Sequence, residues 1–197
     1  MAKEFFGYFD STEGDERSYD ASQFASVLTA GTQNGITSHS GGGLLVTSDG
    51  TGMMTTVTPG GIMINGYVYV MSDDGGELFT LAHSASGAAE RIDRVVARLN
   101  LNSNAREITL GVLEGTPSAA PVLPALTRNG QIYELSIAQV RVRAATATIL
   151  ASDITDERAD ETVCGHAVPV WLKQSELDGQ YSHSALTDAQ IDTVLGG

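Results

Sequence analysis

The chain has 197 residues, with 24 acidic against 11 basic side chains and a formal net charge of −13. This charge argues against a nucleic-acid partner, because phosphate binding needs clustered cations, and equally against an anionic membrane surface. The single cysteine, Cys164, excludes an internal disulfide framework and a cysteine-based zinc cluster. No apolar run approaches the roughly 20 residues that span a bilayer, so we expect no membrane insertion. Residues 1–20 also lack the pattern of a signal peptide.

The first segment, residues 1–19, is an otherwise polar arm that is rich in aromatic side chains. Its candidate interface residues are Phe5, Phe6, Tyr8 and Phe9. Aromatic side chains at a chain end need to be covered, so we expect the arm to pack on its own core or on a neighbouring subunit.

A short helix is predicted after the arm. Asp20 and Gln23 have the spacing of a capping box, and Gly31 suits the C′ position. Phe24, Val27 and Leu28 form a one-sided apolar stripe that is predicted to pack the helix on a sheet. Residues 31–43 are expected to form a loop, so the arm and the helix together occupy residues 1–40.

Short extended runs alternate with glycine-rich turns over residues 41–165. The predicted strands are 44–48, 53–58, 62–71, 77–82, 90–100, 106–117 and 131–142. Asn65-Gly66 favours a type I′ hairpin that pairs 61–64 with 67–70. The turn at 100–104 indicates a second hairpin. This spacing predicts an all-β domain, an antiparallel β-sandwich or barrel-like fold, with a short N-terminal and a short C-terminal helix.

The strand 90–100 mixes charged and apolar residues on both of its faces. Arginine can bind a carboxylate bidentately, so a salt-bridge network is predicted around this strand and the capped turn 153–158. The candidate members are Arg91, Asp93, Arg94, Arg98, Asp153, Asp156 and Arg158. The network could lie at a subunit contact, or the arginines could pair within the chain with Asp153, Asp156 or Glu107. Pairing within the chain is the favoured interpretation.

Residues 166–197 are predicted to be a C-terminal tail with a docking helix. Thr187 and Gln190 have capping-box spacing, and so short a helix needs a surface to dock on. We expect that surface to belong to another subunit. The candidate interface residues of the tail are Trp171, Leu186, Ile191, Val194 and Leu195.

The sequence offers little for catalysis or metal binding. The histidines are His39, His83, His166 and His183, and none has a metal-ligand spacing. Exposed loop positions are the simplest interpretation of them. Cys164 and His166 show no third group that would orient a nucleophile and base, so a small buried thiol is favoured. We therefore expect no enzyme activity, no metal and no cofactor.

Several segments, in order and spacing, resemble a family of phage and prophage tail structural proteins, like the N-terminal domain of siphophage upper baseplate proteins. The resemblance covers roughly residues 5–165. Its segments are Phe24-Ala25, Asn34-Gly35-Ile36, Val57-Thr58-Pro59-Gly60, Ile64-Asn65-Gly66-Tyr67, 91–98, Glu114-Gly115-Thr116-Pro117, Pro124-Ala125-Leu126, Tyr133-Glu134-Leu135, 153–158 and Cys164-Gly165.

This resemblance implies a virion part without catalytic activity, made in the host cytoplasm. It implies an adaptor that attaches a fibre, a receptor-binding element or neighbouring tail and baseplate proteins. Together with the two terminal segments it favours a homo-oligomer, with a trimer preferred. Family members often continue into long fibre or coiled segments, whereas here only the tail 166–197 follows. The alternative is a carbohydrate-binding module that stacks a host-surface glycan on Tyr67, Tyr69 or Trp171.

Overall fold

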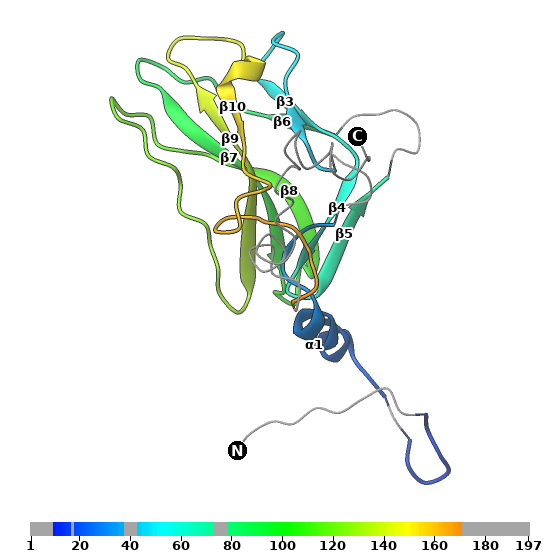
Figure 1. Ribbon diagram of the computed structural model, residues 1–197. Coiled ribbons are helices and arrows are strands. Elements are labelled where there is room, and N and C mark those ends of the chain that lie inside the picture. Colours follow the sequence, from blue (N-terminus) through cyan, green and yellow to red (C-terminus); the bar gives the residue numbers. More distant parts are fainter. Residues whose placement is uncertain (1–9, 17, 38–42, 73–78, 171–197) are drawn as a thin grey trace, which may run out of the picture.

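The computed structural model describes residues 10–16, 18–37, 43–72 and 79–170. Within these residues the chain forms ten strands, one α-helix and a short 3-10 helix (Figure 1). In chain order the elements are α1 (Ala21–Gly31), β1 (Gly35–Thr37), β2 (Val46–Thr47), β3 (Met54–Val57), β4 (Gly60–Ile64), β5 (Tyr67–Met71), β6 (Phe79–Ala82), β7 (Arg91–Asn100), β8 (Glu107–Leu113), β9 (Ile132–Val142), η1 (Ala151–Asp153) and β10 (Ile154–Asp156). No helix of this part of the chain is long and apolar enough to cross a membrane.

The strands form three antiparallel sheets, which confirms the predicted all-β fold. A four-stranded sheet has the order β10-β9-β7-β8, and two three-stranded sheets have the orders β1-β4-β5 and β2-β3-β6. One apolar core joins them: Val95, Ala97 and Leu99 of β7 pack in the same cluster as Ile62 and Ile64 of β4. In Figure 1 the long strands β7 and β9 lie on one side and β4 and β5 on the other, with α1 at one end.

Both predicted hairpins are present. β4 and β5 pair from Gly60↔Met71 to Ile64↔Tyr67, and their turn residues Asn65 and Gly66 have φ of 50° and 78°, as a type I′ turn requires. β7 pairs with β8 on one side and with β9 on the other.

The pairing of β7 with β9 contains a β-bulge. Val95 pairs with Ala138 and Val96 with Ser136, so Ile137 has no partner on β7. One extra residue changes which alternate positions of a strand face the core. Leu135 therefore faces the core on one side of the bulge, and Ala138 and Val140 face it on the other.

Two strands form where the sequence predicted none. β1 lies in the expected loop 31–43 and pairs with β4, and β10 lies in the expected turn 153–158 and pairs with β9. Gly35 explains β1: its φ is 139°, and a Cβ there would collide with the backbone of Gly165. This close approach needs glycine, and its partner is far away in sequence.

Helix α1 has the predicted N-terminus but not the predicted orientation. The Gln23 backbone N–H donates to Asp20 Oδ1 at 2.9 Å, and Gln23 Oε1 accepts from the Asp20 N–H at 2.9 Å, which confirms the capping box. Gly31 is the last helical residue, however, and Thr32, which follows it, is extended.

The apolar stripe of α1 points outward, so its predicted packing on the sheet is wrong. Phe24 is 56% exposed and Val27 44%, whereas Ala25 is buried. The β4–β5 turn explains this, because a Cβ on Gly66 would collide with the carbonyl of Ala25. Only a helix face with small side chains fits so close to a turn.

Candidate functional site

The charged residues of β7 belong to separate buried sites. In the first, Arg91 Nε donates to Asp93 Oδ1 at 2.7 Å and Arg91 Nη2 donates to Asp93 Oδ2 at 3.2 Å. Arg91 Nη2 also donates to the carbonyl of Ser84 at 2.6 Å. Arg91 is 1% exposed and Asp93 0%. Removing both charges from water is expensive, and the bidentate contact offsets part of that cost.

A hydrogen-bonded chain leads from Asp93 to two neighbouring strands. His83 Nδ1 lies 2.9 Å from Asp93 Oδ2, and His83 Nε2 lies 3.1 Å from Thr55 Oγ1. The Gly115 N–H donates to Asp93 Oδ1 at 3.0 Å. Burial raises the pKa of Asp93, but the hydrogen bonds from His83, Arg91 and Gly115 outweigh it, so the pKa lies below its ordinary value.

The hydrogen-bonded residues Thr55, His83 and Asp93 have the order hydroxyl, imidazole, carboxylate that hydrolases use. They are nevertheless closed to a substrate. Thr55 is 0% exposed, and its hydroxyl contacts His83 inside the protein. A nucleophile must be reachable by the atom that it attacks. The residues instead join β3, the end of β6 and β7. The expectation that His83 lies exposed in a loop is wrong, because it is buried at the end of β6.

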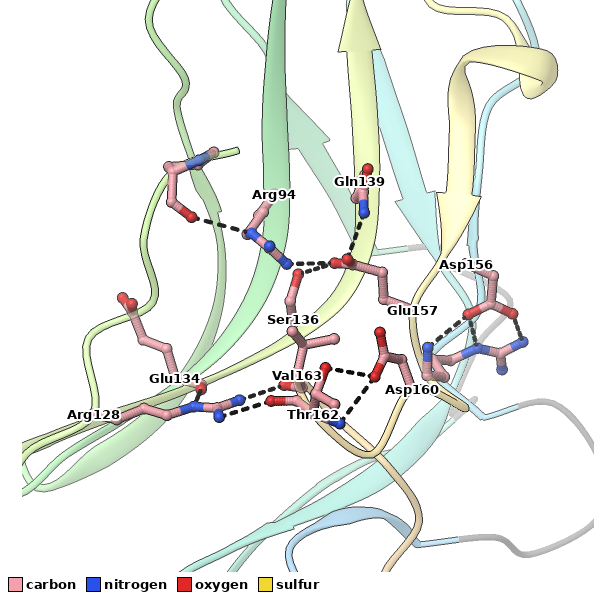
Figure 2. A network of polar contacts seen from close by, with 12 residues as sticks. Arg94, Arg128, Glu134, Ser136, Gln139, Asp156, Glu157, Asp160, Thr162 and Val163 are labelled. Carbon is pink, nitrogen blue, oxygen red and sulfur yellow. Dashed lines mark hydrogen bonds and ion pairs between the residues drawn. The ribbon is translucent and has the colours of Figure 1, made fainter. Parts of the chain in front are cut away.

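A second buried site lies at the β-bulge (Figure 2). Arg94 Nη1 donates to Glu157 Oε2 at 2.7 Å, and Gln139 Nε2 donates to Glu157 Oε1 at 2.6 Å. The hydroxyl of Ser136 also donates to Glu157 Oε2. Arg94 Nε reaches the carbonyl of Pro124 at 3.1 Å. The Glu157 carboxylate thus has three donors, so it is fully paired where it is buried.

Next to it, Glu134 is the buried partner of Arg98. Arg98 Nε donates to Glu134 Oε1 at 2.6 Å, and the Thr127 N–H donates to Glu134 Oε2 at 2.6 Å. Arg128 lies beside this pair and donates to the carbonyls of Glu134, Thr162 and Val163 at 3.1, 2.9 and 2.8 Å (Figure 2). Arg128 thereby holds the segment after β10 against β9.

The predicted network residues of the 153–158 segment do not pair with the β7 arginines. Asp153 binds Arg143 at 3.2 Å, and Asp156 binds Arg158 at 2.7 Å. The hydrogen bonds from Arg158 lower the pKa of Asp156 despite its partial burial. The expected pairing of the β7 arginines with Asp153, Asp156 or Glu107 is therefore wrong.

The true partners of the β7 arginines, all within the chain, are Asp93, Glu157 and Glu134. One signal in the sequence could have found Glu134. It lies in β9 directly opposite Arg98, and opposite charges favour such cross-strand positions. Glu157 has no comparable signal, because its contact depends on the bulge.

The described residues contain few unpaired buried polar atoms, metal-ligand groups or ionised thiols. Among the buried side-chain nitrogen and oxygen atoms of the described residues, only Arg143 Nε lacks a hydrogen-bond partner. The same residues contain no group of three or more His, Cys, Asp or Glu that could hold a metal ion. Burial raises the pKa of the Cys164 thiol to about 12, so it stays neutral near pH 7.

An apolar cleft lies between α1, β5 and the β7–β8 turn. Its volume is about 520 Å³, and Tyr67, Val68, Leu101 and Ile108 are among the residues that line it. A second hollow of about 480 Å³ follows α1 and shares Ser22, Tyr67 and Leu101 with the first. The first volume is within the range of sites that take small molecules or peptide side chains.

Apolar side chains also lie exposed on α1 and β5, the two elements that border this cleft. Val68 and Val70 of β5 are 50% and 70% exposed, and the outward stripe of α1 adds Phe24 and Val27. Of these four, Val68 lines the cleft, whereas Phe24, Val27 and Val70 do not. The sequence pattern predicted instead that the α1 stripe packs on the sheet. Such a pattern identifies the apolar face of a helix but not what that face contacts.

The predicted interface residues at the two chain ends lie outside the described residues. They are Phe5, Phe6, Tyr8, Phe9, Trp171, Leu186, Ile191, Val194 and Leu195. The predicted C-terminal helix lies outside them as well. Of the residues considered for glycan stacking, Tyr67 lines the cleft, and Tyr69 packs against the core, where burial raises its pKa.

Comparison of the chain with protein-family models, with curated proteins and with solved structures finds no match. The functional interpretation therefore depends on the residues and their geometry.

Proposed function

We propose that this protein is a structural component of a phage tail or baseplate. In this role it is an adaptor that attaches fibres, receptor-binding elements or neighbouring tail proteins in the virion, after synthesis in the host cytoplasm. It assembles as a homo-oligomer, with a trimer favoured, and it performs no catalysis. The resemblance over residues 5–165 motivates the proposal, and an antiparallel β fold is compatible with it.

The observation that carries the proposal is the set of exposed apolar side chains on α1 and β5, the two elements that border the cleft. Phe24, Val27, Val68 and Val70 lie on two elements that meet at Gly66, and each is more than two-fifths exposed. Burying apolar area contributes about 25 cal/mol per Å², so such a surface gains free energy in an assembly. The buried charges, by contrast, already have partners within the chain.

Light scattering coupled to size exclusion, at several protein concentrations, tests the proposal. The expected result is a stable oligomer, with a trimer at three times the chain mass of 20.6 kDa. A monomer at every concentration would contradict the proposed homo-oligomer.

A carbohydrate-binding module is the second candidate, and one observation favours it. Tyr67 lines the cleft together with the exposed Arg106 and Glu107, so an aromatic ring and charged groups are available to one ligand. Binding on a glycan array that is lost in Tyr67→Ala but kept in Tyr69→Ala would support this function. Binding that is lost only in Trp171→Ala would support the function but place the sugar elsewhere.

A further inference from the structure

We propose that the cleft between α1, β5 and the β7–β8 turn binds the aromatic arm, residues 5–9, of a second copy of this chain. The inference deepens the proposed function and rests on it, because it names the contact that joins one subunit to the next.

The walls of the cleft suit an extended peptide. β5 is the outermost strand of one three-stranded sheet and β8 of the four-stranded sheet, as far as the described residues show. The two strands contact each other without pairing as neighbours in a sheet, and the cleft opens beside Tyr67 and Val68 at one end of β5. An outermost strand offers backbone N–H and C=O groups to an added segment.

The chemistry of the cleft matches that of the arm. Leu99, Leu101 and Ile108 provide apolar lining, and the exposed Arg106 and Glu107 provide one charge of each sign. Residues 3–10 have the sequence Lys-Glu-Phe-Phe-Gly-Tyr-Phe-Asp, in which four aromatic residues lie between charged residues of both signs. Each aromatic side chain buries about 150–250 Å² when it is covered.

The proposed homo-oligomer favours a second copy over the same copy. Ala21 and Ser22, at the start of α1, line the cleft, so the arm is connected to the edge of its own cleft. The described residues before α1, drawn in blue in Figure 1, lead away from the sheets. The backbone pairing of Thr12 with Asp15 then reverses the chain, so its course does not choose between the two copies, and the cross-linking experiment distinguishes them.

The resulting contact is heterologous, because the arm of one subunit enters the cleft of the next. Such a contact closes into a ring when the rotation between neighbours allows it, and three subunits would give the favoured trimer.

Cross-linking between two differently tagged copies of the full chain tests the proposal. One copy carries Phe6→Cys and the other Val68→Cys, and the two are mixed under mild oxidation. The native Cys164 is buried and does not compete. We expect a disulfide-linked pair of unlike copies, because a docked arm holds the two thiols at high effective concentration.

The matched control replaces Val68→Cys by Val122→Cys, which is 73% exposed and lies between β8 and β9. The Val68 combination should give at least about tenfold more linked product than this control. Equal yields would overturn the inference. A double variant, Phe6→Cys with Val68→Cys, that forms its disulfide only within one copy would also overturn it.

Light scattering separates this inference from the proposed function. Val68→Glu should lower the oligomer mass to that of a monomer, and Val122→Glu should leave it unchanged. If the triple variant Phe5→Ser, Phe6→Ser, Phe9→Ser keeps the full oligomer, the arm is not the contact, although the protein still assembles. If Val68→Glu fails to fold, as judged by circular dichroism, the cross-linking result decides.

Discussion

The region around β7 and the cleft beside α1 place polar and apolar side chains in opposite ways. Around β7, charged groups such as Arg91, Asp93 and Glu157 are buried and paired. On α1 and β5, the elements that border the cleft, Phe24 and Val68 are about half exposed. Paired buried charges need no other molecule, whereas exposed apolar groups gain free energy when another surface covers them. The comparison indicates that the charges of β7 serve the fold, and it supports the proposal that the cleft serves contacts with other molecules.

The buried charges are better understood as a source of specificity than of stability. An apolar replacement of similar volume can be as stable as a buried ion pair, but removal of one partner is costly. At the bulge, Glu157 accepts from Arg94 on β7 and from Ser136 and Gln139 on β9. A shift of β9 by one residue against β7 would separate this carboxylate from Arg94, so we infer that the network favours the observed register of the two strands.

The largest effect is expected for Asp93→Asn. The substitution keeps the shape of the side chain but leaves Arg91 charged and buried. It also places an amide NH₂ against groups that, in the parent protein, donate to the Asp93 carboxylate. The free energy of unfolding should fall by about 3–5 kcal/mol. Urea denaturation followed by circular dichroism measures it.

The matched control is Asp156→Asn, where the side chain is 47% exposed and pairs with Arg158. Its loss should be about 0–1 kcal/mol, as for exposed ion pairs. If the two variants lose similar free energies of unfolding, the buried charges of β7 matter no more to stability than an exposed ion pair.

The second prediction concerns how the stability that is lost in Asp93→Asn depends on pH. The folded pKa of Asp93 lies below the ordinary value of 3.8, so its stabilising contribution is complete above pH 3.8 and is lost as the pH falls toward the folded pKa. The stability difference between the parent protein and Asp93→Asn should narrow as the pH falls below 3.8. Urea titrations at each pH measure it. A difference that widens in acid would mean that the folded pKa is raised.

A smaller effect is expected at the contact between α1 and the β4–β5 turn. Gly66 has a φ of 78°, and a Cβ there would collide with the carbonyl of Ala25. Gly66→Ala should cost about 2–3 kcal/mol, from backbone strain plus the displaced helix. Gly50→Ala is the matched control, with a φ of 77° and only an ordinary contact to Leu150. It should cost about 1 kcal/mol, and equal thermal shifts would place α1 away from the turn.

Local patterns predicted much of this fold, because several signals depend only on neighbours in sequence. The capping box of Asp20 and Gln23 and the Asn65-Gly66 turn are examples, and both are present. The bulge at Ile137 was not predictable in this way. It changes which residues of β9 face the core, and that change has a meaning only when the partner strand is known.

Long-range contacts explain the other differences at the candidate sites. The buried position of His83 depends on its contacts with Thr55, which lies 28 residues before it, and with Asp93, which lies 10 residues after it. No local pattern joins these three residues. The two walls of the cleft likewise come from distant parts of the sequence, α1 on one side and β5 with the β7–β8 turn on the other. The sequence located the apolar residues of α1, but only the tight approach of Gly66 decides which helix face turns inward.

The smallest effect on stability is expected for Phe24→Ser. A buried phenylalanine that is truncated typically costs about 3–5 kcal/mol. Phe24 is 56% exposed, and serine and phenylalanine have similar helix propensities, so the free energy of unfolding of the monomer should change by no more than about 0.5 kcal/mol. Urea denaturation at low protein concentration measures it, with Val27→Ser as a second variant on the same stripe. A loss above about 2 kcal/mol would mean that the stripe packs on its own body. A small loss together with weaker association at high concentration would instead assign the stripe to the surface that covers a neighbour.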